Sequence, residues 1–350
     1  MSWQSAPSVR ATERWAHGDL SDACLAAALT ADRPAPLGAL SPPQRDLAKR
    51  LVDVGLLREE GGAVRMAGHQ LISIAGVTLL VDSRVNFPAG VTHEVYFGFD
   101  SALVAFYVDT TAIRQDDPVL DLGTGSGILG LFLARFSRRA VATDIAPAPL
   151  RLAHMNRLLN EREDALTIRS ERYDDTFERG DRYKVVTFNP PFVAIPEELA
   201  APVFAKGPGA DGLDWCRRIV ERFDDLVLPD GVAYVVADLV GTAAGGAAFV
   251  DELRGTVGPR GLRVDVYQDS RYDYARRETD FARLATYVAR ENPELPIEEV
   301  YRRIEALHTG QLGADCSYLS VMAIRRARSL PTGVQVFNRY KSLPFGETAR

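Results

Sequence analysis

A glycine-rich segment between a predicted strand and a predicted helix constrains this chain more than any other feature. The apolar run Val119–Leu122 contains Asp121 and is followed by glycines at alternate positions, 123, 125 and 127. Glycine lets a backbone turn tightly and approach a ligand without side-chain collision, and a helix starting at Ile128 offers unpaired N–H groups. The pattern predicts an α/β fold in which this strand ends at a ligand-binding loop.

A second acid, Asp144, ends the next predicted strand, 21 residues after Gly123. A carboxylate at Asp121 repels a pyrophosphate but attracts an ammonium and a sulfonium. An acid at the end of the second strand can accept both hydroxyls of a ribose. The pair therefore favours an adenosine ligand without phosphates. The alternative is a dinucleotide fold in which Asp121 merely caps the helix, and the GxGxG spacing, rather than GxGxxG, disfavours it.

The run Asn189-Pro190-Pro191-Phe192 directly follows another predicted strand. Because prolines fix the backbone, the Asn189 side-chain oxygen and the Pro190 carbonyl can both accept from one –NH2 group. Phe192 offers a flat face to a planar amide or an aromatic ring. Such a site can orient a neutral nitrogen for reaction without a His or Cys. The alternative is a proline-stiffened loop with an ordinary packed aromatic.

Strands alternate with helical patterns from about residue 91, which predicts a mostly parallel sheet with both faces covered. The seven predicted strands are Pro118–Leu122, Ala140–Asp144, Leu166–Ile168, Lys184–Phe188, Val232–Ala237, Leu262–Tyr267 and Tyr318–Ile324. Helical patterns fit residues 102–108, 128–136, 147–160, 212–226, 246–254, 274–289 and 297–307.

Residues 1–90 are predicted to form a separate winged-helix-like domain. Two helical patterns, Ser21–Thr30 and Ser41–Leu56, precede a hairpin around Gly61-Gly62 and an apolar segment, Gln70–Asp82. A linker follows at Asn86–Val91. Such a module can read DNA, dimerise or roof an active site. Its equal numbers of basic and acidic residues disfavour DNA reading, so we expect a substrate lid or a dimerisation module.

The glycine loop together with Asp144 resembles the first two motifs of class I S-adenosylmethionine-dependent methyltransferases, over about residues 96–324. The resemblance implies a Rossmann-like seven-stranded sheet in residues 91–350 and S-adenosylmethionine as cofactor. It implies that the first motif holds the amino-acid part of the cofactor, that Asp144 holds the ribose, and that Glu171 meets the adenine. The cofactor residues expected on this basis are Asp121, Gly123, Thr124, Gly125, Gly127, Asp144, Ile145, Glu171, Arg172, Asn189, Tyr96 and Ser101.

The Asn-Pro-Pro-Phe run resembles that of HemK-type glutamine methyltransferases, of adenine-N6 methyltransferases and of guanine-N2 methyltransferases of the methyltransferase-small branch. The stretch Gly209–Asp214 is similar to a segment of the HemK-type group, although a helix cap is an equal interpretation. Tyr96–Ser101 resembles a segment that closes over the cofactor. The resemblance makes Asn189, Pro190 and Phe192 catalytic and Pro191, Phe192 and Phe97 substrate-binding. Two departures from the HemK-type pattern are the amino-terminal region and a helical insertion near 271–311.

Composition narrows the functional classes. The net charge is −6, the wrong sign for a protein that tracks a long phosphate backbone. Three dispersed cysteines and five histidines form no metal-ligand pattern, so we expect no metal and a reducing, cytoplasmic location without a membrane segment. We expect an N-methyltransferase for a small molecule or a protein glutamine, with a homodimer left open. The alternatives are a ribosomal RNA or DNA base methyltransferase and a non-catalytic winged-helix regulator.

Overall fold

The computed structural model describes residues 25, 28–29, 33–82, 95, 97–274, 278–328 and 330–341. Its strands are β1 Ala35–Pro36, β2 Leu57–Glu60, β3 Ala63–Met66, β4 His69–Ile74, β5 Val77–Asp82, β6 Pro118–Leu122, β7 Arg139–Asp144, β8 Leu166–Ser170, β9 Tyr183–Phe188, β10 Val227–Thr242, β11 Gly246–Ala247, β12 Leu262–Asp273, β13 Cys316–Arg326 and β14 Gly333–Asn338. Its α-helices are α3 Pro42–Asp53, α4 Phe99–Tyr107, α5 Ile128–Leu133, α6 Pro147–Leu159, α7 Tyr173–Glu178, α8 Asp214–Glu221, α9 Phe223–Leu226, α10 Ala248–Val257, α11 Glu278–Glu291 and α12 Ile297–Glu305.

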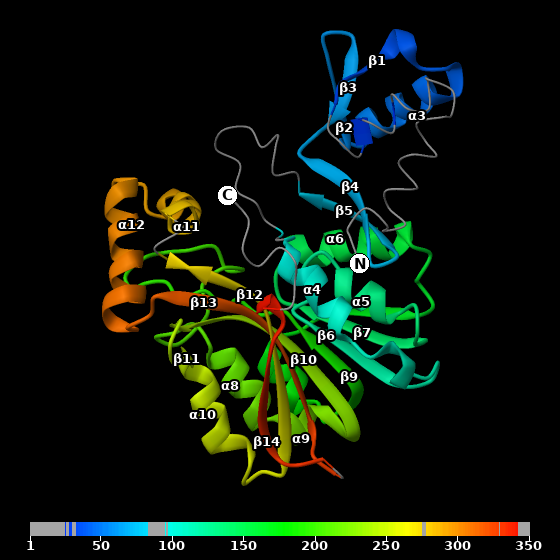
Figure 1. Ribbon diagram of the computed structural model, residues 1–350. Helices are drawn as coiled ribbons and strands as arrows, with labels where there is room; N and C mark the ends of the chain where they lie inside the picture. The colour runs from blue at the N-terminus through cyan, green and yellow to red at the C-terminus, as the bar shows by residue number, and fades with distance from the viewer. Residues whose placement is uncertain are drawn as a thin grey trace.

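A mixed sheet forms the centre of the molecule (Figure 1). Its strands run in the order β14-β12-β13-β10-β9-β6-β7-β8, and β11 pairs with β10. The strands from β8 to β10 are parallel, whereas β13 is antiparallel to both of its neighbours. All seven predicted strands are present, and counted in chain order they lie as 3-2-1-4-5-7-6. The α/β fold prediction is therefore confirmed.

Apolar side chains cover both faces of the sheet. On one face, α8, α9 and α10 pack in a cluster that includes Phe223, Phe249 and Tyr318. On the other face, α4 and α5 pack with the strand β5 in a cluster that includes Leu79, Leu131 and Val236. Because both faces of the sheet are covered, the strands have continuous apolar sequences rather than sequences that alternate between apolar and polar residues.

The amino-terminal module contains α3 and a three-stranded sheet in the order β1-β3-β2. The β2–β3 hairpin turns at Gly61 and Gly62, which both have positive φ, as the sequence predicted. The predicted first helix lies mostly outside the described residues, as does the predicted linker at 86–91. The winged-helix interpretation and the domain boundary at residue 90 stay predictions.

The second hairpin, β4–β5, packs against the sheet domain through two asparagines of α6. The Asn156 amide donates to the carbonyl of Leu80, and its oxygen accepts from the Leu80 N–H. Asn160 makes the same pair of contacts with Thr78. Four residues of helix rise about 6 Å and two residues of strand about 6.6 Å, so the two side chains match alternate residues of β5. The two asparagine side chains therefore take the place of a neighbouring strand at the edge of β5.

Several elements differ from the sequence-based expectation. The predicted helix over 212–226 is divided into α8 and α9, and the pattern at 246–254 begins with the short strand β11. The strand β12 continues to Asp273, six residues beyond its prediction, and β14 adds a further strand beside it. The short helix α7 was not predicted, because six residues carry too little periodicity.

Among the described residues, no helix is both long and apolar enough to cross a membrane.

The hydrogen bonds of Asn156 and Asn160 with β5 give a test of stability. Asn156 is fully buried and also donates to the Ser126 carbonyl, whereas Asn160 is only half-buried. Asn156→Ala leaves one N–H and two carbonyls without partners, and we expect the free energy of unfolding to fall by about 3 kcal/mol. Asn160→Ala, where water can replace the amide, should cost about 1 kcal/mol. Urea unfolding measures both, and equal losses would contradict the assignment.

Candidate active site

One cavity of about 740 Å³ lies at the carboxyl ends of the parallel strands, where ligands bind in open α/β sheets. Its walls come from β5, α4, the loops after β6, β7, β8 and β9, and α11. The predicted site residues that line it are Phe97, Ser101, Asp121, Gly123, Thr124, Gly125, Asp144, Ile145, Glu171, Arg172, Asn189, Pro190, Pro191 and Phe192. Gly127 is not among the lining residues, and Tyr96 lies outside the described residues.

Asp121 is buried at the end of β6 and joins three elements. Its Oδ2 accepts from the Thr124 hydroxyl at 2.5 Å and from the Gly130 N–H of α5 at 2.8 Å. Its Oδ1 accepts from the Thr187 hydroxyl of β9 at 3.0 Å. Burial raises the pKa of Asp121 to about 7, although these three hydrogen bonds favour the carboxylate. The residue therefore fixes the glycine loop and is also a titratable group of the cavity.

Asp144 binds the same loop from the neighbouring strand. Its Oδ2 accepts from the Gly125 N–H and its Oδ1 from the Ala146 N–H, each at 2.9 Å. Burial raises the pKa of Asp144 as well, against the effect of these bonds. A carboxylate oxygen can accept more than one hydrogen bond, so Asp144 retains the capacity to accept from a ligand hydroxyl. Asp144 thus combines a structural bond with an open acceptor position.

Two glycines of the loop after β6, Gly123 and Gly127, have different structural roles. At Gly123, a Cβ atom would approach the Tyr173 hydroxyl to 2.5 Å, so a side chain would collide inside the cavity. At Gly127, the N-cap of α5, a Cβ would instead come within 3.3 Å of Ala153 on α6, and φ is +89°. Gly127 therefore permits close packing of two helices, and its assignment as a direct cofactor contact stays a prediction.

The end of β8 offers a partly engaged carboxylate. Glu171 Oε1 pairs with Arg179, and Oε2 accepts from the Thr176 hydroxyl at 3.2 Å. Next to it, Tyr173 packs edge-on against Phe188 and Trp215, and burial, followed by the charges of Asp144 and Asp121, raises the pKa of its hydroxyl. The hydroxyl stays protonated at neutral pH and can donate beside Gly123.

Asn189 leaves the end of β9 and is held by the first turn of α4. Its amide nitrogen donates to the Ser101 hydroxyl at 3.0 Å and to Asp100 Oδ2 at 3.2 Å. Both partners are buried. Because the nitrogen is committed to α4, the side-chain oxygen is left to act as an acceptor in the cavity. Phe192, two residues after Pro190, packs against the apolar clusters of both sheet faces.

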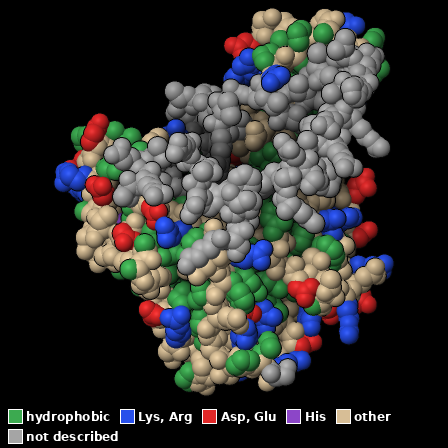
Figure 2. Space-filling view, in the orientation of Figure 1, with side chains coloured by type: hydrophobic (Ala, Val, Ile, Leu, Met, Phe, Trp, Pro, Cys, Tyr) green, Lys and Arg blue, Asp and Glu red, His purple; other side chains and the backbone are tan. Residues whose placement is uncertain are grey.

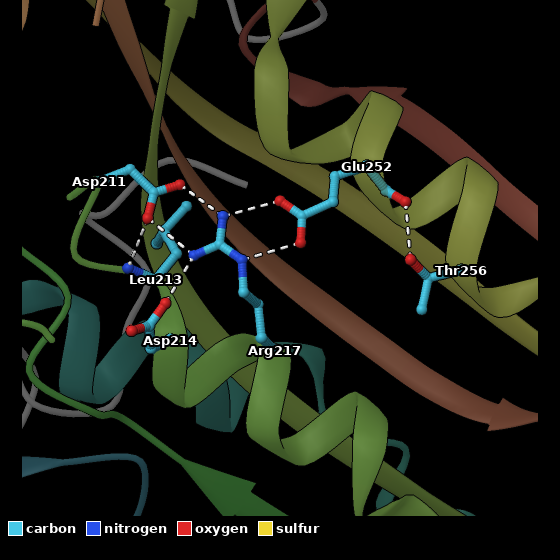
Figure 3. Close-up of polar contacts among 6 residues, drawn as sticks. All are labelled: Asp211, Leu213, Asp214, Arg217, Glu252 and Thr256. Carbon is cyan, nitrogen blue, oxygen red and sulfur yellow. Dashed lines mark hydrogen bonds and ion pairs between the residues drawn. The ribbon is translucent and has the colours of Figure 1, made fainter. Parts of the chain in front are cut away.

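Ion pairs hold the loop that follows the Asn-Pro-Pro-Phe run on its side away from the cavity (Figure 3). Arg217 of α8 donates to both oxygens of Asp211, to Asp214 and to both oxygens of Glu252 on α10. Despite partial burial, these guanidinium contacts lower the pKa of Asp211. Asp211 also accepts from the Leu213 N–H just before α8, close to the predicted cap. None of these side chains lines the cavity, so the stretch Gly209–Asp214 supports the site from outside.

Sequence reasoning missed several residues that line the cavity: Asp82, Asp100, Tyr173, Trp215, Leu284 and Tyr287. Asp100 adjoins the predicted Ser101, and one helical turn at 99–102 could have indicated both. The other residues carry no local motif, and only the tertiary fold brings them to the cavity.

Comparison with known proteins assigns the family. The model of the methyltransferase small domain matches residues 98–206. A release factor glutamine methyltransferase from Rhodospirillum rubrum is 30% identical in a 241-residue alignment that covers 54% of this chain and 70% of that protein. The chain belongs to the HemK-like class I S-adenosylmethionine-dependent methyltransferases.

Two further members of this family align over shorter lengths. A release factor glutamine methyltransferase from Clostridium acetobutylicum is 32% identical over 38% of the chain and 51% of its own length. A ribosomal protein uL3 glutamine methyltransferase from Bradyrhizobium diazoefficiens is 34% identical over 46% of the chain and 53% of its own length. The chain spans about half the length of these two relatives.

The cavity fits the cofactor of this family. Six of its lining residues are acidic and two are basic, which suits a ligand with an ammonium and a sulfonium better than one with phosphates. The buried Ser126 hydroxyl, which lines the cavity, has no hydrogen-bond partner among the described residues. Such an orphaned group indicates a polar ligand.

The raised pKa of Asp121 gives a pH test. The fold favours the protonated carboxyl, so the contribution of Asp121 to stability is full below its ordinary pKa of 3.8 and falls until the pH passes about 7. Asp121→Asn keeps the shape and removes the titration. Without ligand, the unfolding free energy of the wild type should therefore fall relative to the variant by about 1 kcal/mol per pH unit from pH ~5 to ~7. Parallel pH profiles in urea unfolding would refute the assignment.

Proposed function

We propose that this protein transfers a methyl group from S-adenosylmethionine to the side-chain amide nitrogen of a protein glutamine. The observation that carries the proposal is Asn189, whose amide nitrogen is held by Ser101 and Asp100, so that its oxygen is available to the cavity. The relatives of this chain are named for release factors and for ribosomal protein uL3. These two proteins are the first acceptors to test.

In this proposal the cofactor lies across the ends of β6, β7 and β8. The cofactor supplies an electrophilic methyl group on a sulfonium. Asp144 accepts from the ribose hydroxyls, Ile145 and Arg172 flank the adenine, and the glycine loop with Thr124 and Ser126 receives the amino-acid end. Asp121 contributes negative charge near the sulfonium and ammonium. Arg179 and Thr176 already contact the two carboxylate oxygens of Glu171. Glu171 can therefore contact the adenine only through the lone pairs that these two partners do not use.

The acceptor amide lies on the β9 side. The Asn189 oxygen and the Pro190 carbonyl accept its two hydrogens, which turns the nitrogen towards the methyl group, and Phe192 stacks on the amide plane. The site removes no proton from the acceptor nitrogen before transfer. It relies on orienting the acceptor amide and on polarising its N–H bonds. After transfer the nitrogen carries a positive charge and has become acidic, and its proton is released to water.

The charge of the cavity favours a protein glutamine over a nucleic-acid base. One of its two cationic residues, Lys206, donates its ammonium hydrogens to the carbonyls of Pro196, Glu197 and Leu199. On the face of the described residues drawn in Figure 2, basic and acidic side chains are intermixed rather than gathered into one basic field. A phosphate backbone approaching this cavity would meet carboxylates. The base-methyltransferase alternative is therefore not favoured.

Isothermal titration with S-adenosylmethionine tests the cofactor site. Asp144→Ala removes a charged acceptor for the ribose, and we expect the Kd to rise about 10- to 100-fold. Asp230→Ala is the matched control, since Asp230 pairs with Lys184 near the amino-terminal ends of β10 and β9, away from the cavity, and should leave the Kd unchanged. An unchanged Kd in Asp144→Ala would refute the cofactor placement.

Methyl transfer tests the acceptor site. With the release factor or uL3 as substrate, mass spectrometry should find one methyl group on a glutamine. Asn189→Ala should lower the rate at least about 100-fold, because orientation is lost, while its Kd for S-adenosylmethionine stays within about threefold. Ser101→Ala, which removes one of the two bonds that hold Asn189, should give an intermediate rate. Full activity of Asn189→Ala would overturn the proposal.

A further inference from the structure

The helical insertion after β12 is docked on the segment that follows the Asn-Pro-Pro-Phe run. That segment is closed on itself, since the Val193 N–H donates to the Ala205 carbonyl and the Gly207 N–H donates to the Val193 carbonyl. On its outer side, Ile195 and Leu199 pack in one buried cluster with Phe281, Val288 and Ile304 of α11 and α12.

Two buried polar contacts lock the insertion in place. The Asn292 amide donates to the Ala200 carbonyl at 2.8 Å, and its oxygen accepts from the Ala200 N–H at 3.0 Å. His308, whose pKa is lowered by burial, contacts the Ala194 carbonyl through Nε2 at 2.9 Å and the Tyr274 hydroxyl through Nδ1 at 3.1 Å. The carbonyl can only accept, so Nε2 carries the proton and Nδ1 accepts from Tyr274. The insertion is therefore a fixed part of the site.

The orientation of α11 brings one flank of the helix to the cavity. Phe281, Ala285 and Val288 form its buried face. At 100° per residue, Leu284 lies about 65° and Tyr287 about 125° from the centre of that face, both on the same side. Both line the cavity, whereas Thr286 lies on the exposed side and bonds only the Ala282 carbonyl one turn earlier.

This flank lies on the acceptor side. The proposed cofactor position is over β6, β7 and β8, whereas α11 packs on the segment after β9, on the other side of β6 in the sheet (Figure 1). The neighbouring lining residues are Val203, Phe204 and Ala205, and Val203 is 71% exposed, which places it at the mouth. The six acidic lining residues belong to β5, α4, the ends of β6, β7 and β8, and the first turn of α7. The lining residues that the described part of α11 and residues 203–205 contribute are uncharged, and the Arg290 guanidinium lies 6.0 Å from the centre of the Tyr287 ring.

We infer that Leu284 and Tyr287 recognise the acceptor, by binding an apolar side chain next to the glutamine that is methylated. The inference rests on the proposed function and adds a specificity determinant to it. In this inference, a chain segment that places its glutamine between Asn189 and Phe192 leaves the cavity past this wall. An apolar neighbour is desolvated against Leu284, Tyr287 and Val203, whereas a polar neighbour loses water without gaining a partner.

The experiment uses the full-length enzyme and whichever protein, release factor or uL3, the wild type labels with radioactive methyl. Both residues flanking the methylated glutamine are replaced by leucine in one substrate and by asparagine in another. We expect the wild type to show a kcat/KM at least tenfold higher for the leucine-flanked substrate, through KM. In Tyr287→Ala and Leu284→Ala this ratio should fall below threefold, while the Kd for S-adenosylmethionine stays within twofold. Thr286→Ala should retain the wild-type ratio.

The outcomes separate the two proposals. A wild-type ratio near one, or a ratio that the α11 variants leave at the wild-type value, would overturn the inference while the glutamine activity stands. A wild type that labels no glutamine in either protein would overturn the proposed function and the inference with it. A changed Kd for S-adenosylmethionine in the α11 variants would assign the wall to the cofactor and would also overturn the inference.

Discussion

A single buried carboxylate organises the site end of this fold. Asp121 receives hydrogen bonds from the glycine loop, from the first helix after it and from β9. A carboxyl group that is removed from water is tolerable only when hydrogen-bond partners satisfy its oxygens, so each of these elements must hold its position for the others to be stable. The strand that presents Asn189 is thereby fixed relative to the loop that presents Gly123 and Gly125. The geometry between cofactor and acceptor depends on this one set of bonds.

Around that centre, the cavity is assembled from segments that lie far apart in the chain. The α4 helix holds Asn189, α8 and α10 brace the loop behind it through Arg217, and α11 closes the far side. The sheet domain alone supplies a general platform. We propose that the selectivity for an acceptor comes from the parts that are added to it, in line with the general finding that function is placed on folds by their loops and insertions.

The sequence was sufficient to predict those features that are encoded locally. The seven strands follow from short apolar runs, and Asp121, Asp144 and Asn189 follow from motifs at strand ends. The rest is encoded by tertiary contact. Periodicity shows that α11 has a buried face but not that the face meets residues 195–199, and nothing near Tyr173 indicates its hydroxyl beside Gly123. Gly127 belongs to the same motif as Gly123, yet it contacts another helix, because the motif combines ligand approach with helix packing.

The paired asparagines of α6 link two regions that the sequence keeps far apart. The helix begins at Pro147, just after Asp144 and Ile145, and its far half clasps β5, whose last residue, Asp82, returns to the rim of the cavity. Because a helix of this length behaves as a rigid rod, displacement of its first turn is transmitted to the hairpin. The adenosine end of the cavity and β5 are therefore mechanically coupled. Neither can shift relative to the other without breaking the hydrogen bonds between the asparagine side chains and β5.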